Sequence, residues 1–199
     1  MRKIPFILLA VTMFFVACNN KKKGETTVVS DDGKTKVTVD NTTAVQTADE
    51  RTKMMEDLKK LPPLSTDQLK AMLPEEAGGL KRTRFSVNSA LGFATAEATY
   101  SDDADKSIKL TIWDCAGEAG AGFYSLTYWG LFNMQSETEN GYSKTVDFNG
   151  VKAIESYEKN QNEYKLMWTA GNRLLITVEG DNTGLDVVKQ VASGLNIKI

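Results

Sequence analysis

The stretch 93–100, FATAEATY, sets the fold of this chain. Its alanines at 94, 96 and 98 alternate with threonine and glutamate. An alternation with a period of two is typical of a β-strand that has one apolar and one polar face. Because alanine side chains are short, a helix can lie close to the apolar face. The stretch therefore predicts a sheet strand covered by a helix.

Strand-like segments continue on both sides of this stretch. Turns rich in glycine, asparagine and aspartate separate them, which indicates hairpin connections. These segments and their connections predict an α+β fold, namely an antiparallel sheet of about six to seven strands with helices packed on one face. The expected strands are 80–91, 93–100, 108–113, 142–148, 151–157, 163–169 and 173–179, and the expected helices after the first strand are 116–133 and 183–193.

Two further helices are expected ahead of the sheet. Apolar residues recur at helical spacing within 48–61, and the two prolines at 62–63 end that helix. Ser65 and Gln68 then have the spacing of a capping box, which opens a short helix that ends before Pro74.

The last third of the chain resembles exported α+β domains of the PsbP-like kind. The resemblance covers 150–199 and rests on a glycine turn, two strands and a terminal helix. It implies a fold and carries no binding residue over to this chain.

The first 17 residues have the pattern of a signal peptide. Arg2 and Lys3 precede a 13-residue apolar run that is too short to span the roughly 30 Å hydrocarbon core of a bilayer as a helix. The segment Phe15-Val16-Ala17-Cys18 follows and resembles the lipobox of bacterial lipoproteins, with Phe15 where that family usually has leucine. The resemblance implies cleavage before Cys18 and acyl chains such as palmitate on that residue, which hold a protein on a membrane.

This interpretation divides the chain into a signal peptide (1–17), a tether (18–50) and a single α+β domain (51–199). The tether is poor in large apolar side chains, as expected of a segment without a core of its own. Segments 26–29 and 35–39 flank an Asp-Gly turn signal, which predicts a hairpin that forms weakly or only against another part of the protein. The expected location is the cell envelope, lipid-anchored to a membrane, with the outer membrane favoured.

Composition argues against several kinds of site. The chain has no histidine, so it lacks the commonest general base and metal ligand. Its net charge is −2, and nothing in the sequence suggests nucleic-acid binding. Cys115, which ends an apolar strand pattern, is expected to be buried. No metal or cofactor is expected: the turn 103–107 lacks the glycine and glutamate of a calcium loop, and the acid pairs Glu75-Glu76 and Glu137/Glu139 are interpreted as solvated.

The segment 109–118, KLTIWDCAGE, resembles the switch II region of small GTPases. The resemblance implies roles in nucleotide hydrolysis for Asp114, Gly117 and Glu118. No G-x-x-x-x-G-K-[ST] loop precedes the segment and no guanine-reading motif follows it, so we interpret the match as coincidence. The glycines of this region then let helix 116–133 approach the alanine strand, and an anion site at the helix N-terminus is the alternative.

Aromatic residues cover more than one face of helix 116–133. Such a helix is buried in a core or lines a surface for a partner protein or a small apolar ligand, and both interpretations stay open. With no nucleophile–histidine pair available, we expect a non-enzymatic binding or interaction module. The alternatives are a hydrolase or sugar-active enzyme that uses carboxylates, and a purely structural envelope spacer. The candidate surface residues are Phe123, Tyr124, Tyr128, Trp129 and Phe132.

Cys18→Ala tests the anchor. Without the thiol there is no acylation site, so the variant is expected in the soluble fraction while the unsubstituted chain stays with the membranes. Cell fractionation and immunoblotting measure this, and Cys115→Ala is the control because it removes the other cysteine. A Cys18→Ala chain that stays with the membranes, together with an unsubstituted chain that carries no lipid, would contradict the lipoprotein prediction.

Overall fold

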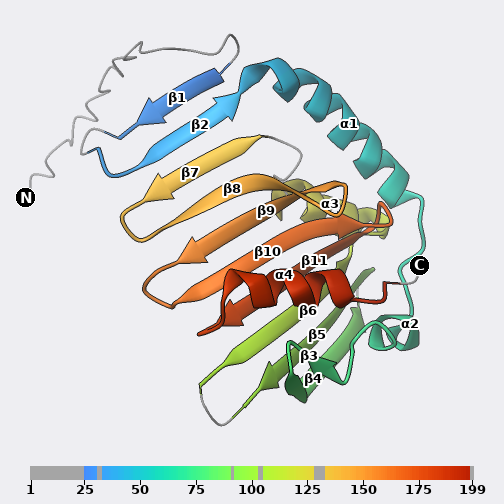
Figure 1. Cartoon of the computed structure of the whole chain (residues 1–199). Helices are drawn as coiled ribbons and strands as arrows, with labels where there is room; N and C mark the ends of the chain where they lie inside the picture. The colour runs from blue at the N-terminus through green and yellow to red at the C-terminus, as the bar shows by residue number, and fades with distance from the viewer. Residues whose placement is uncertain (1–24, 31–32, 91, 103–104, 128–132, 198–199) are drawn as a thin grey trace, which may run out of the picture.

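The computed structural model describes residues 25–30, 33–90, 92–102, 105–127 and 133–197. They form one open antiparallel sheet of eleven strands in the order β1-β2-β7-β8-β9-β10-β11-β6-β5-β4-β3, together with four helices (Figure 1). Within these ranges, no helix combines the length and the apolar character that a membrane-spanning helix needs.

The elements have the following bounds. The strands are β1 Glu25–Val29, β2 Lys36–Asp40, β3 Glu76–Ala77, β4 Leu80–Ala90, β5 Phe93–Ser101, β6 Ser107–Asp114, β7 Met134–Thr138, β8 Gly141–Phe148, β9 Val151–Glu158, β10 Glu163–Ala170 and β11 Leu174–Asp181. The helices are α1 Asn41–Lys59, α2 Thr66–Lys70, α3 Gly117–Thr127 and α4 Leu185–Gly194.

The sheet is larger than the six to seven strands expected from the sequence. The additional strands are β3, β7 and the hairpin β1–β2. The hairpin forms against another part of the protein, because β2 pairs with β7 from Lys36↔Glu137 to Val39↔Met134. β7 has the sequence MQSET, which offers no apolar face for a periodicity argument to detect. The sheet therefore begins at Glu25, inside the segment 18–50 that was expected to be a tether.

Helices lie on both faces of the sheet, so the expectation of helices on one face is wrong. α4 packs on the face that contains Ile176, with Val188 in the shared core. α1 packs on α3, and Tyr124 of α3 meets Leu175 on the opposite face. The cause is β11, whose residues 174–178 are all buried, so both sides of this strand need a cover. Figure 1 shows α4 in front of the sheet and α3 behind it.

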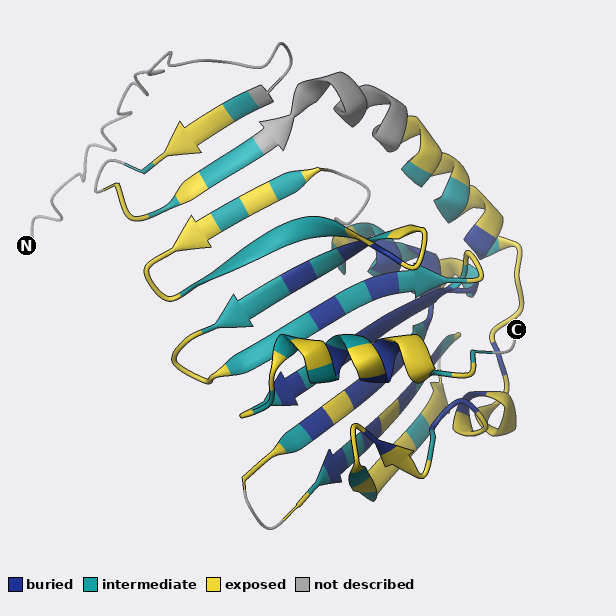
Figure 2. Ribbon diagram, in the orientation of Figure 1, coloured by how far each residue is buried: buried dark blue, intermediate teal, exposed yellow. Residues whose placement is uncertain are grey.

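The core is concentrated in the half of the sheet around β11. Buried residues alternate along β5, β6 and β10 and become rare toward β1 (Figure 2). The alanines of β5 are buried on the α4 face, where Leu69 of α2 joins the same core. α3 contacts β5 from the other side, where the rings of Phe123 and Phe93 lie 5.1 Å apart. The helix that covers the alanines is therefore α2 and not the expected helix 116–133.

Two local predictions are confirmed. The capping box forms, because Ser65 Oγ accepts from the backbone N–H of Gln68 at 3.3 Å and Gln68 Oε1 accepts from the backbone N–H of Ser65 at 2.9 Å. Cys115 is buried, and burial raises the pKa of its thiol to about 12. A thiol in this environment stays protonated and behaves as a small core residue.

Asp114, at the end of β6, is fully buried and joins three segments of the chain. Arg173 binds it with two nitrogens: Nε donates to Oδ1 at 2.9 Å and Nη2 donates to Oδ2 at 2.7 Å. The backbone N–H groups of Leu64 and Ala116 donate to the same carboxylate at 2.6 and 3.2 Å. Arg173 Nη2 also donates to the Pro62 carbonyl at 2.8 Å. The pair thereby holds the α1–α2 connection and the β10–β11 turn against β6.

Arg173→Ala is expected to lower the free energy of unfolding by about 3–5 kcal/mol, because it leaves the buried Asp114 carboxylate without its counter-charge. Urea unfolding at pH 7 measures the change. Lys60→Ala is the control, since Lys60 and Asp57 form an exposed ion pair of the kind that contributes little to stability. If both variants unfold like the unsubstituted chain, Asp114 does not hold these segments together.

Candidate functional site

The α3 face of the sheet changes from apolar to polar toward β7. Ile154 and Met167 belong to the core next to α3. The next row on the same face runs Ser143, Ser156, Lys165 across β8, β9 and β10, because these residues are direct partners in the strand pairing. We call this part of the α3 face, over β7 to β10, the polar face.

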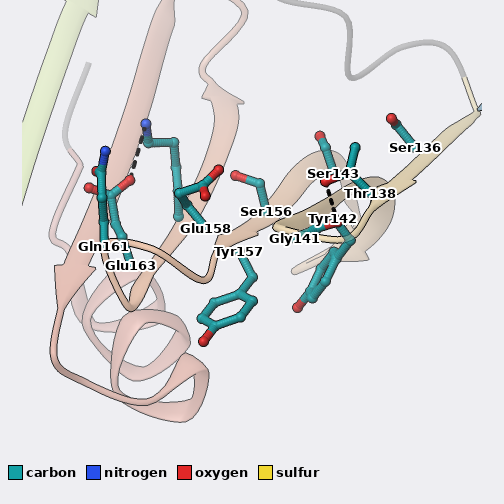
Figure 3. Close-up of a pocket in the computed structure, with 11 residues that line it drawn as sticks. Ser136, Thr138, Gly141, Tyr142, Ser143, Ser156, Tyr157, Glu158, Gln161 and Glu163 are labelled. Carbon is teal, nitrogen blue, oxygen red and sulfur yellow. Dashed lines mark hydrogen bonds and ion pairs between the residues drawn. The ribbon is translucent and has the colours of Figure 1, made fainter. Parts of the chain in front are cut away.

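A pocket of about 470 Å³ lies on the polar face. In Figure 3 the hydroxyls of Ser143 and Ser156 lie on one side of the strands, whereas the rings of Tyr142 and Tyr157 point to the other. The pocket is therefore polar because of strand alternation, which sends the aromatic side chains to the α4 face. Its lining residues are Ser136, Thr138, Gly141, Tyr142, Ser143, Ser156, Tyr157, Glu158, Gln161, Glu163 and Lys165.

Backbone contact at the pocket requires a glycine. A Cβ atom on Gly141 would overlap the carbonyl oxygen of Tyr157, so only glycine lets β8 approach β9 at this point. On the reverse side, the ring of Tyr157 stacks on Tyr164 at 4.4 Å and lies 6.2 Å from the ring of Tyr142. The strands of the pocket are thus packed closely along their backbones and through their aromatic rings.

Charged groups gather at one end of the pocket. Glu158 and Glu163 are direct partners across β9 and β10. Lys165 Nζ lies 3.6 Å from Glu163 Oε1 and 2.7 Å from Glu179 Oε1. Burial raises the pKa of Glu163; Lys165 opposes this rise, and the nearby Glu179 and Asp181 add to it. Burial by itself lowers the pKa of Lys165, but its bonds to Glu179 and Glu163 outweigh burial and the pKa is raised.

The lining favours a polar ligand over a metal ion or an apolar one. It supplies three serine hydroxyls, the Gln161 amide, two carboxylates and one ammonium group, which together donate and accept hydrogen bonds in several directions. The hydroxyl of Thr138 also lines the pocket but already bonds to the backbone of Gly141 and Asn140. In the part of the chain that the structure describes, no three histidine, cysteine, aspartate or glutamate residues are placed to hold a metal ion. A ligand with many hydroxyl groups matches this set best, because each hydroxyl both donates and accepts.

The buried carboxylate of Glu155 holds the pocket strands together on the α4 face. Glu155, 1% exposed, accepts a hydrogen bond from Tyr142 Oη at 2.9 Å and pairs with Lys144 at 3.0 Å and Lys189 at 2.7 Å. Burial by itself would raise the pKa of Glu155, but the bonds from Lys189, Lys144 and Tyr142 outweigh it and the pKa is lowered. Because Lys189 belongs to α4, the cluster ties that helix to β8 and β9.

The aromatic residues proposed from the sequence are only partly described. Tyr124 is 1% exposed and packs in the core with Leu58 and Leu175. Phe123 is half-buried, with its ring 5.6 Å from that of Trp113. These two rings face the core rather than solvent. The other named positions lie outside the described residues and stay predictions: Tyr128, Trp129, Phe132 and the lipidation residue Cys18.

The segment that resembles switch II has a structural explanation in this protein. Asp114 is fully engaged by Arg173 and backbone donors, as described above. Gly117 has a positive φ of 78° in the turn that opens α3, and Glu118 is exposed. A Cβ atom on Gly120 would come within 2.9 Å of the Asp114 carbonyl oxygen. The glycines thus allow α3 to start directly against the end of β6.

None of the other acids named from the sequence is among the lining residues, although Glu137 lies on β7 between Ser136 and Thr138, which line the pocket. Glu75 pairs with Arg82, and Glu139 pairs with Lys34. Asp105 occupies a turn with a positive φ of 60°, and Asp103 lies outside the described residues.

Sequence reasoning did not select the pocket residues. Ser143, Ser156 and Lys165 alternate with other side chains in predicted strands, a pattern that reports a solvent face and nothing more. Glu158 and Glu163 flank a polar turn, where acids are usually solvated. The pairing register brings these residues together, and periodicity within one segment does not encode it.

Comparison of the chain with family models, with curated proteins and with solved structures finds no match. A functional assignment therefore rests on the geometry of the chain's own residues.

Glu155→Gln tests the buried cluster through its pH dependence. A carboxyl group whose pKa is lower in the folded than in the unfolded state stabilises the fold above the unfolded pKa, and this contribution is lost as the pH falls through the folded pKa. The ordinary value for glutamate is 4.5. The variant is expected to be less stable than the unsubstituted chain at pH 7, with a difference that shrinks below about pH 4.5. Urea unfolding at pH 7 and pH 3 measures it.

Glu163→Gln is the matched control, because the pKa shift has the opposite sign. The folded state disfavours the ionised form of Glu163, because burial raises the pKa of this residue. The neutral variant is therefore expected to match or slightly exceed the unsubstituted chain in stability at pH 7. Equal losses for the two variants at pH 7 would show that the Glu155 cluster has no special role in stability.

Proposed function

We propose that this chain is a lipid-anchored protein of the bacterial cell envelope that binds a saccharide-like ligand in the pocket on β7 to β10 and leaves it chemically unchanged. The observation that carries the proposal is the pocket itself, about 470 Å³ lined by hydroxyl, amide, carboxylate and ammonium groups. The predicted lipid on Cys18 supplies the location.

The side chains that would contact the ligand stand on a rigid support. Ser143, Ser156 and Lys165 project from neighbouring strands, and Lys165 is held by Glu163 and Glu179. On the α4 face, the Glu155 cluster links the same strands to α4. Donors and acceptors fixed before binding lose little conformational freedom when the ligand arrives, which favours affinity and selectivity.

The pocket lies toward the end of the sheet that carries the N-terminal strand. In the strand order, β2 alone separates β7 from β1. The chain that leads to Cys18 enters the sheet at β1, so this arrangement favours a ligand that is presented near the membrane. Glycans of the envelope meet both requirements, since they are rich in hydroxyls and lie close to membranes.

Binding is tested with the full chain in detergent micelles and soluble peptidoglycan-derived oligosaccharides as the probe. Isothermal titration is expected to show binding that Ser156→Trp weakens at least tenfold, because the indole fills the pocket. Ser86→Trp is the control: Ser86 is an exposed serine on β4, far from β9 in the strand order. If the oligosaccharides do not bind, or both variants bind equally, this site does not recognise saccharides.

A carboxylate-based hydrolase is the second candidate, and one observation favours it. Glu163 has a raised pKa and lies opposite Glu158 within the pocket, and glycosidases use one protonated and one ionised carboxyl group. Release of reducing ends from the same oligosaccharides distinguishes the two functions. The binding proposal expects no turnover, whereas turnover that Glu163→Gln abolishes would establish the enzyme.

A further inference from the structure

β1, the first strand of the described residues, lies at one edge of the sheet. Among the described residues, β1 pairs with β2 alone. The backbone N–H of Ser30 donates to the Thr35 carbonyl at 2.9 Å, which sets the alternation along the hairpin. Val28 therefore bonds to β2, whereas the N–H and C=O groups of Thr27 and Val29 point away from the sheet.

Within the described residues, the opposite edge of the sheet carries features that block strand addition, whereas the outer side of β1 has no strand partner. β3 covers the start of β4, and a register shift between Arg82 and Arg84 bends the strand that follows. Lys70 and Arg82 lie 5.2 and 4.9 Å from the ring of Phe85. Short cover strands, bulges and cations are the usual means of blocking strand addition.

β1 has the sequence ETTVV, with no lysine, arginine, proline or bulge. Val28 and Val29 are 48% and 49% exposed. An open edge with these properties accepts another strand readily.

We propose that the occupant of this edge is a second copy of the chain, which pairs β1 with β1 in antiparallel fashion. The strand is complementary to itself when Thr27 lies opposite Thr27, because Thr26 then lies opposite Val28 on both sides. In this register the outward backbone groups of Thr27 meet those of the second Thr27, and those of Val29 meet those of Glu25 in the other copy. These three residue pairs exchange about six backbone hydrogen bonds. Cross-strand threonine pairs are already compatible with this fold, since Thr27 and Thr38 Oγ1 atoms lie 3.0 Å apart.

Attachment to one membrane supplies the concentration that such a short contact needs. A five-residue strand pair buries less area than a dimer that is stable in dilute solution. Six residues lie between Cys18 and Glu25, so the start of β1 is within about 25 Å of the expected anchor even when this segment is fully extended. Two anchored copies thus hold their β1 edges in the same thin layer, which raises their effective concentration. The pairing is independent of the ligand proposed above and depends on the anchor only for its strength.

The geometry of the pair has a consequence for the polar face. The two-fold axis of an antiparallel strand pair stands perpendicular to the sheet, so both copies present the polar face on the same side. The pockets of the two copies then open in the same direction at a fixed spacing. A repetitive polymer could occupy both and gain avidity.

The register is tested by disulfide formation in membranes that contain the full chain. Thr27→Cys is expected to give at least five times more covalent dimer on mild oxidation than the unsubstituted chain, which retains Cys18 and the buried Cys115. In the proposed register the two Cα atoms of residue 27 lie about 5.5 Å apart, within the range that a disulfide spans.

Val29→Cys is the matched control on the same strand, because both Thr27 and Val29 are exposed. Two copies of residue 29 would lie about 14 Å apart, which is beyond the reach of a disulfide. Equal dimer from both variants would indicate random collision and overturn the register, and no dimer from either would overturn the pairing.

Amide hydrogen exchange of the unsubstituted chain gives a second readout that needs no substitution. As the protein-to-lipid ratio rises, the Thr27 and Val29 amides are expected to become protected, whereas the Val28 amide, already bonded to β2, stays unchanged. Thr27 exchange that does not respond to protein density would overturn the proposal.

Discussion

Asp114 is a carboxylate with no exposed surface, and the crossing of the chain from one face of the sheet to the other depends on it. α1 belongs to the core on the α3 face, and α2 belongs to the core on the α4 face. The segment from Pro62 to Leu64 makes the crossing, and it is held by Arg173 Nη2 and by Asp114 itself. Burial of the charge is tolerable because an arginine fork and two backbone donors surround it. This ion pair thus holds the connection at the point where the chain passes from α1 on one face of the sheet to α2 on the other.

The two faces of the sheet serve different purposes. The α4 face is apolar from β5 to β10, and toward β8 it carries the tyrosine rings and the buried Glu155. The α3 face is apolar only where α3 and α1 cover it, and it becomes a row of serines and a lysine toward β7. The contacts that stabilise the pocket strands therefore lie on the α4 face, which leaves the polar face available to a ligand. The same half of the sheet ends in the unprotected edge of β1, so ligand binding and self-association would use adjacent parts of the molecule.

Periodicity within single segments predicted most of this fold. The strand alternation of 93–100, the capping box at Ser65 and the burial of Cys115 depend on local sequence, and the structure confirms them. The number of strands and the placement of helices on both faces depend on pairing between distant segments: β2 needs β7, and the both-sided burial of β11 needs α3 as well as α4. The pocket was missed for the same reason, because Ser143 and Lys165 become neighbours only through the register of β8, β9 and β10.

Native mass spectrometry of the full chain, extracted with its lipid from its own cell envelope, tests most directly whether this is an anchored binding protein. Our account predicts a mass increase from acyl chains together with a co-purifying saccharide, and slowed amide exchange across β8 and β9 when that ligand is retained. An unlipidated chain would contradict the anchor. A co-purifying ligand that protects other strands and leaves the polar face unchanged would contradict the proposed site.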